Sequence, residues 1–172
     1  WAESYARMRR LASALTGAGL GIGDTVSVIA ANTPEMFEAH FGVPMAGCVL
    51  NTINTRLEAE TISYILENSD CRVLIVDTAF APAVVPALES LPADVRKNIR
   101  VVDIRDAAMG DLAPVGDEDY ESFIGAGDPD YDWQMPADEW QALALGYTSG
   151  TSGRPKGVVY HLSLIHISEP TR

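Results

Sequence analysis

The sequence of 172 residues has only two cysteines and three histidines, which leaves little for a disulfide framework or a metal site. Cys48 and Cys71 lie far apart, one inside an apolar stretch and one at the start of another. Cysteines in such surroundings are usually buried free thiols, so we expect neither a disulfide nor a shared metal ion. The histidines are not spaced like a ligand cluster, and we expect His40 to play a structural role in an amphipathic helix.

Positive charge is also scarce, with 12 Lys and Arg against 24 Asp and Glu and a formal net charge of -12. This balance argues against a nucleic acid or an anionic membrane surface as a partner. No apolar run approaches the length of a transmembrane helix. The acidic cluster at 117–119 is expected to be a solvated surface turn. Because the chain begins at Trp1 and not at Met, we expect its natural start to lie further upstream.

Apolar residues alternate between helical and strand patterns along the first hundred residues. Helical spacing occurs at 2–15, 34–47, 57–66 and 81–91, and apolar runs typical of buried strands occur at 25–30, 49–50, 72–77 and 99–104. We expect Asn32 to cap the second helix, with Pro34 in its first turn. Strands of continuous apolar character between helices predict an α/β fold, with a largely parallel sheet flanked by helices. The acidic segment 106–140 contains several aromatic residues, so we expect an ordered surface connection.

The most informative segment is 147–157, Tyr-Thr-Ser-Gly-Thr-Ser-Gly-Arg-Pro-Lys-Gly. It lies between an apolar stretch, 142–145, expected to be a buried strand, and a second expected strand, 158–160. Glycines let a backbone approach a ligand closely and turn its N–H groups inward, while hydroxyls and lysine donate further hydrogen bonds to anionic oxygens. Arg154 and Lys156 together form a local cationic spot. The segment therefore predicts a loop that binds the phosphates of ATP.

Two common phosphate-binding motifs do not fit this segment. The Walker A motif needs Gly-Lys-Ser/Thr at the start of a helix, whereas Lys156 lies between Pro155 and Gly157, which favours an extended loop. The dinucleotide fingerprint is absent as well, because the glycines at 17–23 follow a helical pattern instead of a strand. We expect those glycines to form a helix end and a turn.

The loop resembles the signature of the adenylate-forming (AMP-binding) enzymes, Tyr/Phe-Thr-Ser-Gly-Thr/Ser-Thr-Gly-x-Pro-Lys-Gly-Val. Only Ser152 differs from that pattern, and it keeps the hydroxyl group. Segments 23–26, 32–36, 50–57 and 133–140 are similar to acyl-CoA synthetases, and most similar to bacterial fatty-acyl-CoA synthetases. The resemblance covers residues 1–161 and implies the first part of that family's large N-terminal domain.

The resemblance implies a reaction and a set of roles. A carboxylic acid would attack Mg²⁺-bound ATP to give an acyl-adenylate, and CoA would then displace AMP. The residues implied to cradle the β- and γ-phosphates are Thr148, Ser149, Gly150, Thr151, Ser152 and Gly153, and Lys156 would offset charge on the departing pyrophosphate. The family's motifs for adenine, ribose and Mg²⁺, and its C-terminal lysine, would lie beyond Arg172. No catalytic residue is therefore assigned, and we expect this fragment to be inactive alone.

The resemblance ends at His161. Residues 162–172 are similar to a translated sequencing-adapter segment, so we expect a non-native tail that packs poorly. A cysteine-poor protein that uses ATP is expected in the cytoplasm. Two alternatives stay open: a non-catalytic nucleotide-binding module, and the adenylation domain of another adenylate-forming enzyme, such as a peptide synthetase or a luciferase. The sequence does not indicate which carboxylic acid is used, nor the oligomeric state.

Overall fold

The computed structural model covers the whole chain, and the residues it describes are 1–106, 110, 112–148 and 153–163. The strands are β1 (Thr25–Ile29), β2 (Val49–Thr52), β3 (Cys71–Asp77), β4 (Arg100–Ile104), β5 (Glu118–Asp119), β6 (Ala142–Tyr147) and β7 (Gly157–His161). The helices are α1 (Ala2–Gly17), α2 (Pro34–Met45), α3 (Ala59–Asn68), α4 (Ala81–Glu89), α5 (Ala93–Arg96) and α6 (Tyr120–Gly125), with a 3₁₀ turn η1 (Thr78–Phe80).

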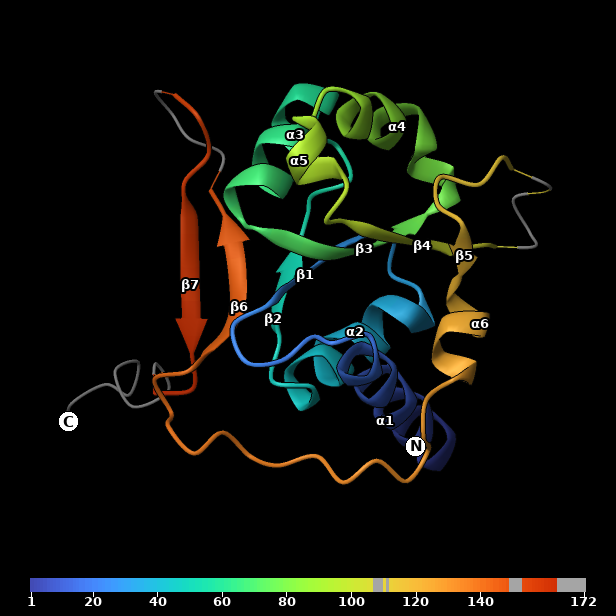
Figure 1. Ribbon diagram of the computed structural model, residues 1–172, viewed down its shortest axis with the longest axis vertical. Helices are drawn as coiled ribbons and strands as arrows, with labels where there is room; N and C mark the ends of the chain where they lie inside the picture. Colours follow the sequence, from blue (N-terminus) through green and yellow to red (C-terminus); the bar gives the residue numbers. More distant parts are fainter. Residues whose placement is uncertain (107–109, 111, 149–152, 164–172) are drawn as a thin grey trace.

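The strands form one sheet in the order β5-β4-β3-β1-β2-β6-β7 (Figure 1). Every neighbouring pair is parallel except β6 and β7, which are antiparallel. The predicted α/β fold with a largely parallel sheet is thus confirmed. The short elements β5 and α6 were not predicted from the sequence.

Helices cover both faces of the central sheet (Figure 1). On one face, α1, α2 and α6 enclose an apolar cluster that includes Leu11, Val28 and Phe123. On the other face, α3 and α4 enclose a second cluster that includes Leu66 and Leu74. All residues of β1 are buried. This two-sided burial explains the continuous apolar run at 73–76 in β3, whereas β1 also buries the polar Thr25 and Ser27.

The start of α2 differs from the expectation in one residue. Thr33, not Asn32, is the N-cap, and its hydroxyl oxygen accepts a hydrogen bond from the Met36 amide at 3.4 Å. The physical reason is Pro34, because proline is favoured at the first helical position and so makes its predecessor the cap. His40 is exposed, and its Nδ1 lies 2.7 Å from the Met36 carbonyl oxygen, which agrees with a structural role.

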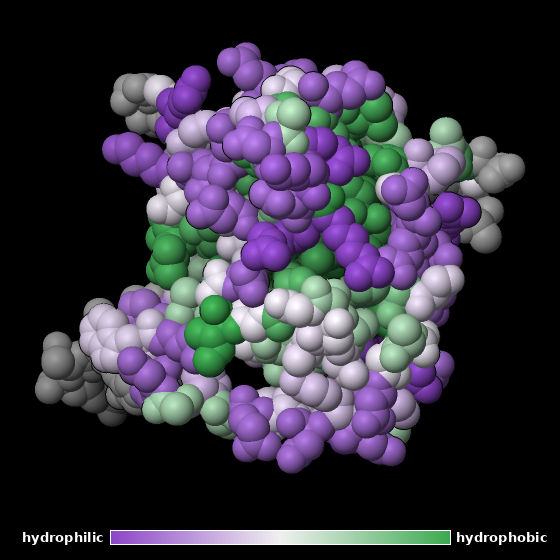
Figure 2. Space-filling model, in the orientation of Figure 1, coloured by the Kyte–Doolittle hydropathy of each residue, from purple (hydrophilic) through white to green (hydrophobic). Residues whose placement is uncertain are grey.

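The β6–β7 end of the sheet is less covered than the centre. The stretch 142–145 does form a strand, but all of β6 is half-buried, so the prediction of a buried strand is wrong. In β7, Val158 and Val159 are exposed, the latter at 54%. Figure 2 shows hydrophobic side chains at this outer edge of the molecule. The described residues provide no helix over this hairpin, which explains the exposure.

The described part of the connection between β4 and β6 is ordered, as expected, and it contacts α1; residues 107–109 and 111 of the predicted connection lie outside the described residues. Arg9 Nε donates a hydrogen bond to the Tyr131 carbonyl oxygen at 2.9 Å, and Trp133 Nε1 donates one to Tyr5 Oη at 3.0 Å. The prediction of a solvated turn at 117–119 is wrong for Glu118 and Asp119, which form the half-buried strand β5. Glu118 pairs with Arg100, and Asp119 caps α6. None of the helices in the described part of the chain combines the length and apolar character that a bilayer crossing requires.

The beginning of the predicted tail folds back onto the chain. The Ser163 amide donates a hydrogen bond to the Glu139 carbonyl oxygen at 3.1 Å, and Ser163 is 8% exposed. The prediction that the tail packs poorly is therefore wrong for Ser163. Residues 164–172 lie outside the described residues, so the boundary between 161 and 162 stays a prediction.

Candidate functional site

The candidate phosphate loop follows the carboxyl end of β6. Because β6 is parallel to β2, and β2 to β1, this end of β6 lies at the edge of the sheet where the central strands also end. In open α/β sheets, ligands bind outside the carboxyl ends of the strands. The fold thus places the loop where such a sheet offers a binding site.

Three of the predicted phosphate-binding residues are described by the structure. Thr148, Gly153 and Lys156 are all exposed, and the Thr148 amide donates a hydrogen bond to the Lys156 carbonyl oxygen at 3.0 Å. This bond closes the base of the loop and leaves the Lys156 side chain exposed. The other predicted residues lie outside the described residues: Ser149, Gly150, Thr151 and Ser152.

Two glycines of the loop are needed for different reasons. Gly153 has a φ of +147°, a conformation that residues with a side chain rarely adopt, although a Cβ there would have no heavy atom within 4 Å. Gly157 is limited by packing instead, since an added Cβ would lie 3.1 Å from Leu145 Cδ1. The first glycine therefore shapes the loop, and the second lets β7 lie close to β6.

Helix α3 contacts the chain on both sides of the undescribed stretch. Tyr147 Oη donates a hydrogen bond to Asn68 Oδ1 at 2.8 Å, and the Arg154 guanidinium carbon lies 5.2 Å from the centroid of the Tyr64 ring. Burial raises the pKa of Tyr147, so its hydroxyl stays protonated and can donate at neutral pH. Sequence reasoning missed Tyr64 and Asn68, because they are about eighty residues away from the loop and belong to no motif.

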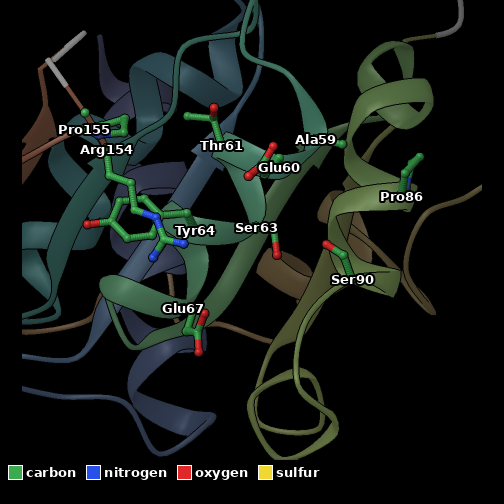
Figure 3. Close-up of a pocket in the computed structure, with 11 residues that line it drawn as sticks. Ala59, Glu60, Thr61, Ser63, Tyr64, Glu67, Pro86, Ser90, Arg154 and Pro155 are labelled. Carbon is green, nitrogen blue, oxygen red and sulfur yellow. The ribbon is translucent and has the colours of Figure 1, made fainter. Parts of the chain in front are cut away.

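The predicted cationic spot of Arg154 and Lys156 is divided in the structure. A hollow of about 700 Å³ lies between α3, α4 and residues 153–155, and Glu60 and Glu67 are among its lining residues (Figure 3). The Arg154 side chain extends into this hollow and lies across Tyr64, whereas Lys156 does not line it. Carboxylates would repel a phosphate from the hollow. Both cations are exposed, but only Lys156 lies outside the hollow that these carboxylates line, which leaves it as the candidate cation for an anionic ligand.

The remaining candidates for reactive chemistry are structural. Cys48 and Cys71 are free and buried, as expected. Burial raises their pKa values to about 12 and about 11, so neither is a thiolate at neutral pH. Among the described residues, no three His, Cys, Asp or Glu side chains gather closely enough to hold a metal ion.

Comparison with known proteins shows which family the chain is similar to. The family model described as "AMP-binding enzyme" matches residues 1–167. An acetate/butyrate–CoA ligase of Arabidopsis thaliana is 44% identical over 169 residues, which is 94% of this chain and 30% of that protein. An acetate–CoA ligase of Humulus lupulus is 42% identical over 167 residues, which is 92% of this chain and 29% of that protein.

Solved structures agree with the sequence relatives. A Mycobacterium tuberculosis fatty acyl CoA synthetase superposes with a TM-score of 0.74 at 27% identity, covering 96% of this chain and 29% of that one. An anthranilate CoA ligase in complex with anthranoyl-AMP gives a TM-score of 0.75 at 25% identity, covering 92% of this chain and 29% of that one. The chain thus spans less than a third of the length of each of these four relatives.

Proposed function

Because the chain belongs to the AMP-binding enzyme family, we propose that it is the N-terminal part of a longer AMP-forming acid–CoA ligase. Such an enzyme activates a carboxylic acid in two steps. The carboxylate attacks the α-phosphate of ATP, which releases pyrophosphate and leaves an acyl-adenylate. The CoA thiol then attacks the acyl carbon and displaces AMP, which gives the thioester.

In this proposal the loop between β6 and β7 holds the β- and γ-phosphates. The residues that would contact them are Thr148, Ser149, Gly150, Thr151, Ser152 and Gly153. Lys156 would offset the negative charge that develops on the departing pyrophosphate. Phosphoryl chemistry depends mainly on positioning and charge stabilisation, and this loop offers backbone amides, hydroxyls and one cation for both purposes.

The observation that supports phosphate binding most strongly is the position and the exposure of the loop in the fold. It emerges from the carboxyl end of β6, is closed by the bond between Thr148 and Lys156, and presents Lys156 to solvent. A loop packed into the apolar interior, with its amides paired, could not admit a triphosphate. Of the described loop residues, Thr148, Gly153, Arg154 and Lys156 are exposed, and Pro155 is half-buried.

The binding sites for Mg²⁺, CoA and the acid are proposed to lie mostly in the rest of the longer protein. Mg²⁺ would arrive on the ATP phosphates, and we propose that its protein ligands, the CoA site and most of the acid pocket lie outside this chain. The half-buried β6 and exposed β7 support this idea, because the sheets of α/β proteins are normally covered on both faces. The chain alone would then lack activity.

The acid is proposed to be aliphatic. The curated relatives named above act on acetate or butyrate according to their names, and a solved relative is a fatty acyl CoA synthetase. This favours a short-, medium- or longer-chain fatty acid as the substrate. We propose the cytoplasm as the location, although the Arabidopsis relative is a peroxisomal protein.

Acid-dependent exchange of pyrophosphate into ATP, measured with the full-length protein and a panel of carboxylic acids, tests the proposal. We expect exchange with at least one aliphatic acid, and formation of its CoA thioester when CoA is added. Binding of Mg-ATP without exchange for any acid would instead indicate a non-catalytic nucleotide-binding module. Exchange without thioester formation would indicate an adenylate-forming enzyme of another type.

A further inference from the structure

Helix α3 holds residues on both sides of the phosphate loop through one of its faces. Tyr64 and Asn68 are four residues apart, so they lie one above the other on the helix surface. Asn68 accepts the hydrogen bond of Tyr147, immediately before the loop, at 2.8 Å. Tyr64 lies under the guanidinium group of Arg154, in the second half of the loop, at 5.2 Å from its ring centroid.

This helix is itself firmly placed. Its residues Ile62, Ile65 and Leu66 are buried in the apolar cluster that α3 shares with α4 and β3. Tyr64 and Tyr147 both pack against the edge of the same cluster. A side chain that packs on Tyr64 therefore contacts a half-buried residue held against the apolar core.

Electrostatics favour the same position for Arg154. Glu60 and Glu67 belong to α3 and line the hollow that Arg154 enters. Figure 3 shows Glu67 on the same helix as Tyr64, with the guanidinium group above the ring between the loop and the helix. A planar cation over an aromatic ring is attracted by the ring's negative face, and nearby carboxylates add to that attraction.

We infer that Arg154 is a positioning residue, which docks on Tyr64 of α3 and thereby holds the second half of the loop in place for the phosphates of ATP. The inference rests on the proposed function for its ligand. Arg154 itself does not contact phosphate in this arrangement, because its guanidinium group lies over Tyr64. Lys156, two residues later, remains exposed for that purpose.

The test uses the full-length protein with the variants Tyr64→Leu, Tyr64→Phe and Arg154→Ala. Leucine removes the ring but keeps apolar packing on the core, whereas phenylalanine keeps the ring and loses only the hydroxyl. We expect Tyr64→Leu and Arg154→Ala each to raise the KM for Mg-ATP in pyrophosphate exchange by about two- to fivefold, which corresponds to one exposed cation–π contact. The KM for the acid should stay constant, and Tyr64→Phe should match the wild type.

A double variant identifies whether the two residues act as one contact. Combining Tyr64→Leu with Arg154→Ala should be no worse than either single change, because each removes the same interaction. Additive effects on the KM for Mg-ATP would overturn the inference. Equal increases in the KM for Mg-ATP and the KM for the acid would also overturn it, since they would indicate a general structural defect.

A second measurement separates this inference from the proposed function. Hydrogen exchange of the Thr148 amide, which bonds to the Lys156 carbonyl, and of the amides of Gly153, Arg154, Lys156 and Gly157 reports on the loop without any catalysis. We expect faster exchange in Tyr64→Leu and wild-type exchange in Tyr64→Phe. Unchanged hydrogen exchange in Tyr64→Leu would contradict the positioning role of the Arg154–Tyr64 contact. A wild-type protein without acid-dependent pyrophosphate exchange would instead contradict the proposed function.

Discussion

Tyr120 donates a hydrogen bond from its hydroxyl to Glu38 Oε2 at 2.9 Å, and this bond joins α6 to α2. Glu38 is only 2% exposed, and it also pairs with Arg7 of α1. Arg7 reaches Glu121 as well, with an Nη2 to Oε1 distance of 2.6 Å. Three helices that cover one face of the sheet are thus joined by a single polar network around one buried carboxylate.

Removing the Tyr120 hydroxyl should destabilise the fold. In Tyr120→Phe the buried Glu38 loses one donor, and a hydrogen bond to a charged buried group contributes about 1–3 kcal/mol. We expect the free energy of unfolding, measured by urea denaturation, to fall by about that amount. Tyr131→Phe is the matched control, because Tyr131 Oη contacts Thr16 Oγ1 at an exposed site. That variant should change the free energy by less than about 0.5 kcal/mol, and a similar loss in both would contradict the role of the network.

The same network predicts a dependence on acid pH. The hydrogen bond from Arg7 lowers the pKa of Glu121 below its ordinary value of 4.5. A carboxyl group whose pKa is lowered by folding stabilises the protein above its unfolded pKa and loses this effect as the pH falls through the folded pKa. We therefore expect the unfolding free energy to fall more steeply below about pH 4.5 in the wild type than in Glu121→Gln. Parallel pH profiles of the wild type and Glu121→Gln would show that the Arg7–Glu121 pair does not contribute to the free energy of unfolding.

The two cysteines should be unreactive in the folded protein. Burial raises the pKa of Cys48 to about 12 and that of Cys71 to about 11, so the reactive thiolate is suppressed at neutral pH. A thiol reagent such as DTNB should label neither residue in native buffer and both in denaturant. Rapid labelling of either in the native protein would show that its surroundings open readily.

Gly153 should be required for its backbone conformation alone. Its φ is +147°, whereas the φ of Gly21 lies outside the range that side chains disfavour. At both positions an added Cβ would have no heavy atom within 4 Å. Gly153→Ala therefore strains the backbone by about 1–3 kcal/mol without a steric clash. We expect it to slow acid-dependent pyrophosphate exchange of the full-length protein by at least about fivefold. Gly21→Ala should have no effect, and equal rates in both variants would remove the conformational requirement.

The central strands of the sheet were predictable from the sequence because both of their faces are buried. The strands β1 and β3 are buried between two helical layers, and the valines, isoleucines and leucine that fill most of their positions were sufficient to find them. The strand β2 was predicted too short, because Asn51 is polar although fully buried, and its amide donates to Ser27 Oγ on the neighbouring strand. Such a pair is visible only once the strands are placed side by side.

The candidate site was predictable in part. The loop residues are contiguous, so their residue types and the family resemblance predicted phosphate binding, which stays a prediction. Tyr64 and Asn68 contact Arg154 and Tyr147 from a helix that is distant in sequence, and no local pattern marks them. The position of Arg154 also depends on that helix, so the sequence predicted a cationic spot with Lys156 but not the contact with Tyr64.

The most direct test of the phosphate loop is the variant Lys156→Ala in the full-length protein, compared with Lys156→Arg. Loss of one positioned donor to developing negative charge lowers a catalytic rate by about 10²–10³. We expect Lys156→Ala to slow acid-dependent pyrophosphate exchange on that order while the KM for the acid changes little, and Lys156→Arg to retain more of the rate. Unchanged pyrophosphate exchange in Lys156→Ala would contradict the assignment of this loop to the phosphates of ATP.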